Sequence, residues 1–248
     1  MIQPKTYIYG KHAVAEAVRS KPKAIREILL DPRMDDTRLR ELIEASGIKT
    51  SMHAGNLPKG IDADANHQGV IAEVILDELT VSYDRFIRDL KVGADTALVL
   101  LNEVQDPHNV GAVIRSAAAF GIAGVLIPEH NQAPVTGSVV KVSAGMAFRI
   151  PLVRIGNENN TIRDLKKLGF WVYGLAGEGS NSLTGEKFDA PAVFVLGNEG
   201  VGLREKTREA CDILLSIPMN PACESLNASA SMSVTLYAWS AQHPDALK

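Results

Sequence analysis

The C-terminal two thirds of the chain alternates apolar, strand-like runs with stretches of helical periodicity. The apolar runs cover 97–101, 123–127, 171–175, 192–196 and 213–217. Helical patterns lie between and after them, near 110–120, 136–144, 161–168, 203–210 and 226–242. Strands that are apolar along their whole length are typical of parallel sheets with helices on both faces. The sequence therefore predicts an α/β fold with a parallel sheet between about residue 94 and residue 248.

The N-terminal part has the periodicity of a second, smaller α/β unit. Helices are predicted at 12–20 and 37–46, and strands at 25–30, 48–52 and 70–76. The segment 55–69 is rich in Gly, Asn, Asp and Pro, which indicates irregular backbone. A charged stretch, 77–93, precedes the first strongly apolar strand and is the expected linker. The 248 residues thus divide into domains at 1–76 and 94–248.

The charge of the chain is close to balanced but unevenly distributed. With 26 Lys and Arg against 29 Asp and Glu, the net charge of −3 gives no sign of a nucleic-acid partner. Residues 1–60, however, hold 11 basic and 7 acidic side chains. This basic density is suited to phosphate contacts, and it is equally compatible with a solvated face. The candidates for such phosphate contacts in this region are Lys11, Arg19, Lys23 and Arg26.

The cysteines and histidines show no metal-binding spacing. Cys211 and Cys223 form no CxxC motif, and the six histidines are scattered. The N-terminus lacks the pattern of a secretory signal, and no run of about 18 apolar residues is present. We therefore expect a cytoplasmic protein with no metal, no disulfide scaffold and no membrane partner.

Residues 102–115 form the first of three unusual loops that follow predicted strands. In open parallel sheets, ligands bind beyond the carboxyl ends of the strands. Asp106-Pro107 predicts a turn, and Asn109 is a candidate helix N-cap. Arg115 interrupts an otherwise apolar helix and needs an anionic or oxygen-rich partner if it faces inward. The alternative is that Arg115 lies on the surface and Asn109 only caps the helix.

The second loop, 193–203, is glycine-rich, and the third, 217–231, contains two prolines. In the second loop, Gly197, Gly200 and Gly202 allow close backbone approach to a ligand, and Glu199 adds one acid. The order GxxGxG does not match a dinucleotide fingerprint. In the third loop, Ser225 and Asn227 stand at a helix N-terminus, where either is also plausible as a simple cap.

Taken in order, these loops resemble the signature motifs of the SpoU family of RNA ribose methyltransferases, within the knotted SPOUT class. The motifs are Asn…Arg after a strand, then GNEGVGL, then IPMNPACESLNASAS, over residues 98–239. YGKHAVAEAV at 9–18 and HQGVIAE at 67–73 resemble the ribosomal-protein-like substrate-binding domain of its TrmH/RlmB group. The resemblance implies a trefoil knot at the C-terminus and a homodimer.

The resemblance also implies the reaction. The family transfers the methyl group of S-adenosylmethionine to a ribose 2′-hydroxyl of RNA, releasing S-adenosylhomocysteine without a metal. The two-domain layout is most similar to enzymes that act on a guanosine of large-subunit ribosomal RNA. A transfer-RNA methyltransferase and a non-catalytic RNA-binding or assembly factor are the alternatives.

By motif match, the resemblance implies roles for particular residues. The implied catalytic residues are Arg115, Asn109, Glu199, Ser225 and Asn227. The implied cofactor-binding residues are Leu196, Gly197, Ile217, Met219, Leu226 and Ala176. Arg115 is the family's proton acceptor, but a guanidinium does not readily deprotonate, so we favour a buried, fixed cation that stabilises the developing alkoxide and contacts RNA.

Overall fold

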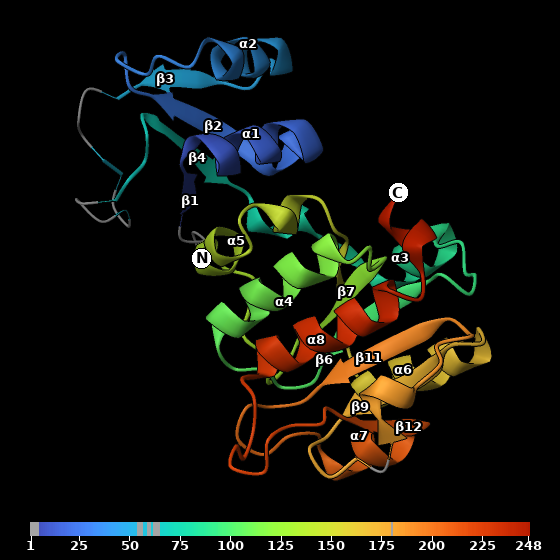
Figure 1. Ribbon diagram of the computed structural model, residues 1–248. Coiled ribbons are helices and arrows are strands. Elements are labelled where there is room, and N and C mark those ends of the chain that lie inside the picture. The colour runs from blue at the N-terminus through green and yellow to red at the C-terminus, as the bar shows by residue number, and fades with distance from the viewer. Residues whose placement is uncertain (1–4, 54–56, 59–60, 62–64, 180) are drawn as a thin grey trace.

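The computed structural model describes residues 5–53, 57–58, 61, 65–179 and 181–248. The described chain forms two sheets, each with its own helices (Figure 1). The smaller sheet lies in the N-terminal part and the larger sheet in the remainder. The predicted division into a small and a large α/β unit matches this arrangement.

The N-terminal sheet has the order β1-β4-β2-β3. Strand β4 is antiparallel to both of its neighbours, whereas β2 and β3 run parallel. The elements are β1 (Thr6–Tyr9), α1 (Lys11–Ser20), β2 (Ile25–Leu30), α2 (Thr37–Ser46), β3 (Thr50–Met52) and β4 (Val70–Val74). Strand β1 was not predicted, whereas the other five elements match the predicted helices and strands to within a few residues. Part of the predicted irregular segment 55–69 lies outside the described residues.

The larger sheet is parallel throughout, with the order β10-β12-β9-β11-β6-β7-β8-β5. The five predicted strands are present as β6 (Ala97–Leu101), β7 (Gly124–Pro128), β9 (Trp171–Leu175), β11 (Ala192–Leu196) and β12 (Ile213–Ser216). Three further strands were not predicted: β5 (Thr80–Ser82), β8 (Leu152–Ile155) and β10 (Asn181–Ser182). Each is four residues or shorter, and tertiary pairing rather than an apolar run places it in the sheet.

The expected linker, 77–93, is itself structured. It contains β5, which pairs with β8 at one edge of the larger sheet, and α3 (Tyr83–Asp89). Phe86 of α3 packs against the core of the larger domain. The segment that follows the small domain therefore completes the sheet of the large one.

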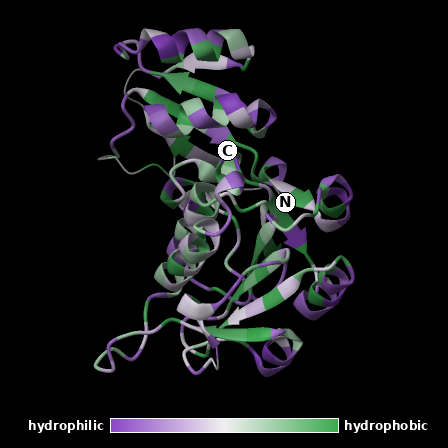
Figure 2. Ribbon diagram, turned by 45° about the vertical axis from the view of Figure 1, so that its right-hand side comes forward, coloured by the Kyte–Doolittle hydropathy of each residue, from purple (hydrophilic) through white to green (hydrophobic). Residues whose placement is uncertain are grey.

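Helices cover both faces of the larger sheet, as predicted. On one face lie α4 (Pro107–Ala119), α5 (Gly137–Val142) and α8 (Ala228–Ser240), and on the other lie α3, α6 (Glu158–Lys167) and α7 (Glu205–Ala210). Successive residues of β6 enter different cores: Val99 packs on the α4 side, and Leu98 and Leu100 on the α6 side. Figure 2 shows the strands as largely hydrophobic ribbons between more polar helices. Each such side chain contributes about 1.5–3 kcal/mol through burial.

The C-terminal segment is held against distant parts of the large domain. Helix α8 packs on α4, and Gln242 accepts a hydrogen bond from the backbone N–H of Phe188 at 3.2 Å. The ring nitrogens of His243 lie 2.6 Å from Asp95 and 2.8 Å from the carbonyl oxygen of Phe188. These contacts tie the end of the chain to the segments before β6 and β11. The trefoil knot implied by the family resemblance stays a prediction.

The two domains contact each other through α1 and β1 on one side and α5 with the 3₁₀ turn Met146–Phe148 on the other. The guanidinium of Arg149 donates two hydrogen bonds to the carboxylate of Glu16, one of them 2.9 Å long. The ammonium group of Lys141 donates to the hydroxyl of Tyr9 at 2.6 Å. Glu16 is buried, and the hydrogen bond from Arg149 lowers its pKa. A charge-assisted contact therefore holds the small domain on the large one.

We predict that Glu16→Gln weakens this domain contact and lowers the free energy of unfolding by about 1 kcal/mol at pH 7. The folded-state pKa of Glu16 lies below its ordinary value of 4.5, so the ion pair stabilises the protein above about pH 4.5. This contribution disappears as the pH falls through the folded-state pKa. Thermal unfolding of both proteins between pH 7 and pH 3.5 measures the difference. Glu41→Gln, at an exposed position of α2, is the control. A stability difference that does not change with pH would contradict this role.

Candidate functional site

The three unusual loops meet at the carboxyl edge of the larger sheet. Strands β6, β11 and β12 are parallel, and their carboxyl ends lead into the loops at 102–106, 197–203 and 217–227. In Figure 1 these loops lie together below the amino end of α8. Because parallel strands deliver their carboxyl ends to the same edge, segments about 100 residues apart in sequence become neighbours.

A hydrogen-bond network centred on Asn109 connects the three loops. The Nδ2 group of Asn109 donates to Oε1 of Glu199 at 3.0 Å. Its Oδ1 accepts from Nδ2 of Asn227, also at 3.0 Å. Asn109 is only 6% exposed, and these two hydrogen bonds give both the donor and the acceptor of its amide a partner within the protein. The structure therefore brings together three of the five implied catalytic residues.

Glu199 is held as a carboxylate by N–H donors. Its oxygens accept from the backbone of Gln105 at 3.2 Å and of Asp106 at 3.3 Å, in addition to Asn109. Partial burial raises the pKa of Glu199, but these hydrogen bonds outweigh burial and hold the pKa below its ordinary value. A carboxylate in this setting is a weak base and a good hydrogen-bond acceptor.

Of the two asparagines predicted as helix caps, only Asn227 caps its helix. Asn227 does cap α8, because its Oδ1 accepts from the backbone N–H groups of Ser229 and Ala230 at 2.9 and 3.2 Å. Asn109 does not cap α4, which begins earlier, at Pro107, with Asp106 as the N-cap. Proline is favoured in the first turn of a helix, where its missing N–H has no partner to lose. The amide of Asn109 is thereby left to bind Glu199 and Asn227.

A pocket beside this network contains all six implied cofactor-binding residues. They are Ala176, Leu196, Gly197, Ile217, Met219 and Leu226. Glu199 and Ser225 line the same pocket. Apolar side chains on several walls and exposed backbone groups of the glycine loop suit a flat, partly polar ligand. These features fit the adenosine and methionine parts of S-adenosylmethionine.

The glycine loop is closed more tightly than its sequence indicates. Asn198 and Gly202 exchange two backbone hydrogen bonds, of 3.0 and 2.9 Å. A Cβ atom at Gly197 would lie 2.4 Å from the carbonyl carbon of Gly202, closer than packing allows. Gly202 itself has a φ of +71°. These two glycines are therefore required by the turn, whereas a Cβ at Gly200 would meet only the side chain of Asn198, at 3.5 Å.

Sequence reasoning missed the role of Asn198. Its Oδ1 accepts from the backbone of Gly200 and Val201 at 2.9 and 3.2 Å. Its Nδ2 donates to the carbonyl of Glu103 at 2.9 Å. It therefore ties the glycine loop to the loop after β6. The signal was its position inside the GNEG motif. The other missed pocket residues include Leu175, Gly177, Leu215, Glu224, Ala228 and Ser231.

Arg115 corrects one expectation. We expected a buried guanidinium, but its side chain is exposed on α4 and has no hydrogen bond or ion pair within the described part of the chain. The buried face of α4 is formed by Val110, Val113, Ile114 and Ala117. Arg115 lies six residues after Asn109, which is about 9 Å along the helix and on a different side of it. Within one chain, therefore, it does not contact the Asn109 network.

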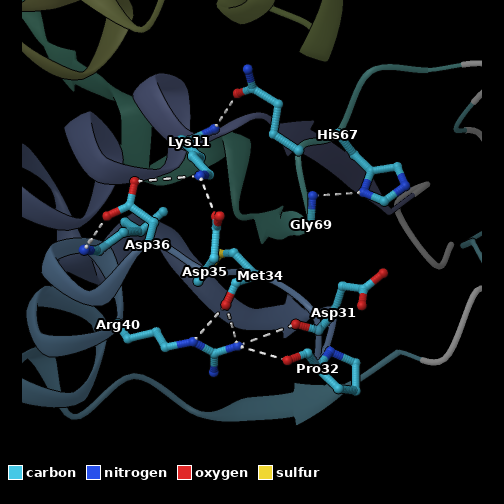
Figure 3. A network of polar contacts seen from close by, with 11 residues as sticks. Lys11, Asp31, Pro32, Met34, Asp35, Asp36, Arg40, His67 and Gly69 are labelled. Atoms are coloured by element: carbon cyan, nitrogen blue, oxygen red, sulfur yellow. Dashed lines mark hydrogen bonds and ion pairs between the residues drawn. The ribbon is translucent and has the colours of Figure 1, made fainter.

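The implied RNA-binding residues of the small domain differ in their surroundings. Lys11 forms ion pairs with Asp35 and Asp36 (Figure 3). Its Nζ lies 3.3 Å from Oδ1 of Asp35 and 3.6 Å from Oδ2 of Asp36. Arg26 is paired with the buried Glu73 at 3.0 Å. Arg19 and Lys23 are exposed. In the same view, Arg40 donates to the backbone carbonyls of residues 31, 32 and 34 and so holds the loop before α2 in place.

Among residues 5–53, 57–58, 61, 65–179 and 181–248, no group of three or more His, Cys, Asp or Glu side chains is arranged to hold a metal ion. No helix in the described part of the chain is long and apolar enough to cross a membrane.

Comparison with known proteins gives matches over both domains. The SpoU rRNA Methylase family model matches residues 96–237, and a model for RNA 2'-O ribose methyltransferase substrate binding matches residues 7–79. The chain is 41% identical over 242 residues to the 23S rRNA (guanosine-2'-O-)-methyltransferase RlmB of Xanthomonas campestris, with 96% of each chain covered. It is 35% identical to the protein of that name from Nitrosomonas europaea, over 96% of this chain and 92% of the relative.

Solved structures match the fold as a whole. The SpoU methyltransferase AviRb of Streptomyces viridochromogenes, in complex with the cofactor AdoMet, superimposes with a TM-score of 0.82. Its sequence is 25% identical, and the match covers 97% of this chain and 91% of that one. An AdoMet-bound rRNA methyltransferase from Sinorhizobium meliloti, 22% identical, has the same fold with a TM-score of 0.73 over 95% and 86% of the two chains.

We predict that Gly197→Ala weakens binding of S-adenosylmethionine at least tenfold, because the new methyl group forces the glycine loop open. Isothermal titration with S-adenosylmethionine measures the effect. Gly200→Ala, three residues away in the same loop, is the matched control and should bind within about twofold of the unchanged protein. Equal loss in both variants, or in neither, would show that the tight turn does not form the cofactor pocket.

Proposed function

The chain belongs to the SpoU family of RNA methylases, and we propose that the ribosomal RNA it methylates is 23S rRNA and that the modified nucleotide is a guanosine. It uses S-adenosylmethionine to methylate a ribose 2′-hydroxyl of ribosomal RNA. The observation that carries the choice of 23S rRNA and guanosine is the 41% identity to a 23S rRNA (guanosine-2'-O-)-methyltransferase over 96% of the chain. The meeting of Asn109, Glu199 and Asn227 beside the cofactor pocket supports the methyl transfer itself. A ribosomal substrate also supports the cytoplasmic location that we propose.

The cofactor pocket excludes water and binds the polar edges of the cofactor. S-adenosylmethionine, when bound, supplies a methyl group on a positively charged sulfur. The side chains of Leu196, Ile217 and Leu226 line the pocket and exclude water, so that water does not compete as the nucleophile. The backbone groups of the glycine loop are positioned to bind polar edges of the cofactor. Ser225, two residues before the N-cap of α8, adds a hydroxyl group to the lining of the pocket.

Glu199 and Asn109 position the reacting hydroxyl. Oε2 of Glu199 accepts one hydrogen bond, from Gln105, and retains a lone pair for the ribose 2′-hydroxyl. Because its pKa is held low, Glu199 first orients this hydroxyl and accepts its proton only as the bond to the methyl carbon forms, after which the proton passes to solvent. Asn109 and Asn227 fix the carboxylate in place through the network described above. Orientation of this kind lowers the entropic part of the barrier.

Arg115 supplies a fixed positive charge at the partner's site in a homodimer. It is exposed on α4, which packs on α8, and α8 carries an apolar stripe that includes Val234, 42% exposed, and Tyr237, 63% exposed. The ring of Tyr237 packs edge-on against Phe120, which follows α4. Large apolar side chains exposed on neighbouring helices favour a protein interface. From that interface the guanidinium stabilises the alkoxide that develops as the 2′-hydroxyl attacks.

A non-catalytic RNA-binding factor on the same fold is the second candidate. Such a protein would not need an intact network beside the cofactor pocket. Asn109, Glu199, Asn227 and Arg115 are all present, and three of them are already joined by hydrogen bonds. This supports an active enzyme.

We expect the purified protein to transfer labelled methyl from S-adenosylmethionine to 23S rRNA, at the ribose of a guanosine. Nuclease digestion and mass spectrometry locate the label. Arg115→Ala should lower kcat at least 100-fold while the affinity for S-adenosylmethionine stays within twofold. Arg163→Ala, at an exposed position of α6, is the control. A label on a base, or nearly normal turnover by Arg115→Ala, would refute this assignment.

Mixing two inactive variants tests the action of Arg115 across the dimer. Arg115→Ala keeps its cofactor pocket, and Gly197→Ala keeps its arginine. If Arg115 acts at the partner's site, random mixing of equal amounts should restore about a quarter of the normal activity, since half of the dimers then hold one complete site. Tyr237→Glu in both proteins should abolish this rescue and give monomers in light scattering. If Arg115 acts within its own chain, mixing restores nothing.

A further inference from the structure

The side-chain amide of Gln132 pairs with the backbone of Val104 much as a neighbouring strand would. Its Oε1 accepts a hydrogen bond from the N–H of Val104 at 2.9 Å, and its Nε2 donates to the carbonyl oxygen of Val104 at 2.7 Å. The backbone N–H of Ala133 donates to the same oxygen at 3.0 Å. The loop that follows β7 therefore holds both hydrogen-bonding groups of one residue in the loop that follows β6.

The carbonyl group of Val104 belongs to the same peptide unit as the N–H group of Gln105. A peptide unit is planar, and in its trans form the C=O and N–H bonds point in opposite directions. The N–H of Gln105 donates to Oε2 of Glu199 at 3.2 Å. Gln132 and Glu199 thus bind opposite ends of one rigid plane. A rotation that turns the carbonyl away from Gln132 also turns the N–H away from Glu199.

The loop after β6 depends on such contacts because its backbone is strained. Glu103, one residue before Val104, has a φ of +63°, a left-handed conformation that residues other than glycine rarely adopt. A conformation of this kind persists only where surrounding groups impose it. Asn198 donates to the carbonyl oxygen of Glu103 at 2.9 Å, and Gln132 binds the next residue along the chain. Removal of the Gln132 amide therefore allows the peptide after Val104 to rotate.

The two loops hold each other reciprocally. The side chain of Gln105 donates to the carbonyl oxygen of Asn131 at 2.6 Å, directly before Gln132 in the chain. Asn131 also has left-handed backbone, with a φ of +53°. The loop after β7 thus supports Glu199, although the described residues that line the cofactor pocket include none from 129–133.

The peptide between Val104 and Gln105 bears on the state of the Glu199 carboxylate as well as on its direction. Two N–H donors on the oxygen of Val104 polarise this peptide and strengthen the hydrogen bond that its N–H donates. Partial burial raises the pKa of Glu199, and the backbone N–H groups of Gln105 and Asp106 are among the donors that outweigh burial. These donors also leave one direction for the remaining lone pair of Oε2.

We propose that Gln132 is a positioning residue for methyl transfer, which fixes the peptide between Val104 and Gln105 and thereby directs the carboxylate of Glu199 toward the reacting hydroxyl. This inference rests on the proposed function, because it takes Glu199 as the group that orients the ribose 2′-hydroxyl. It assigns a role in the reaction to a side chain that lies outside the three loops of the site.

Gln132→Met tests the peptide link without any RNA. The substitution keeps the length of the side chain and removes both of its hydrogen bonds to Val104. Amide hydrogen exchange, followed by NMR on isotope-labelled protein, reports on the N–H of Gln105 itself. This amide should exchange about tenfold faster in the variant, because its bond to Glu199 is lost more often. The amides of β6 and β11 should keep their protection.

The kinetics of the same variant test the role in the reaction. The substrate is a 23S rRNA fragment that contains the modified nucleotide. Gln132→Met should lower kcat about tenfold, because the hydroxyl is less often held in line with the methyl group. KM for the fragment and the affinity for S-adenosylmethionine should both stay within about twofold, since the proposed role of Gln132 is exerted through Glu199.

Gln242→Met is the matched control. The amide of Gln242 likewise binds backbone through both of its ends, accepting from the N–H of Phe188 at 3.2 Å and donating to the carbonyl of Glu186 at 3.0 Å. These contacts precede β11, whereas Glu199 follows that strand. Gln242→Met should lower the temperature of unfolding but leave kcat and the exchange of the Gln105 amide within about twofold. An equal loss of kcat in both variants would overturn the positioning role.

Gln132→Glu isolates the Nε2 donor and serves if Gln132→Met does not fold, as judged by thermal unfolding. A carboxylate at this position still accepts from the N–H of Val104, but it repels the carbonyl oxygen of Val104 that Nε2 binds. The Gln105 amide should again exchange about tenfold faster, and kcat should again be about tenfold lower.

The outcomes separate this inference from the proposed function. Unchanged exchange at Gln105, or faster exchange with unchanged kcat, would overturn the positioning role of Gln132. A higher KM for RNA with unchanged kcat would overturn it too, because Gln132 would then act in RNA binding. Absence of methyl transfer by the unchanged enzyme would overturn the proposed function, while the exchange measurement still decides whether Gln132 holds the peptide.

Discussion

The amide of Asn109 is the contact on which the site depends. It donates to Glu199 and accepts from Asn227, so a single buried side chain joins the start of α4, the glycine loop and the cap of α8. A buried amide that lost either partner would pay a desolvation penalty of about 1–3 kcal/mol. The network therefore favours one relative position of the three loops. The cofactor pocket and the acceptor for the ribose hydroxyl are placed by that same arrangement.

The glycine loop forms a narrow wall of the proposed cofactor pocket at the carboxyl edge of the sheet. Its two backbone hydrogen bonds between Asn198 and Gly202 keep it narrow, and Asn198 ties it to the loop after β6. Apolar walls and backbone groups of this pocket suit the proposed cofactor.

The positive charges proposed to act on RNA lie on two separate surfaces, one on the small domain and one on α4. The basic excess lies in the small domain, which Arg149 and Lys141 of the large domain hold through Glu16 and Tyr9. Some of its cations, such as Arg26, are already paired with acids, whereas Arg19 and Lys23 are exposed. Arg115 is exposed on a different surface, next to the apolar stripe of α8. This distribution supports the proposal that exposed cations of the small domain contact phosphates of the RNA.

The sequence by itself determined the parallel α/β architecture of the large domain and the presence of a smaller N-terminal unit with its own helices and strands. Periodicity and glycine spacing are local properties, and a motif retains its residue types whatever surrounds it. Only the tertiary structure decided that Asn109 is a bridge and not a cap, that β5, β8 and β10 join the sheet, and that Arg115 is exposed. Those outcomes depend on partners distant in sequence. Packing against such partners decides which side of α4 is buried, and so whether Asn109 or Arg115 faces the interior. A local sequence pattern likewise does not predict which strands pair when they lie 50 to 100 residues apart.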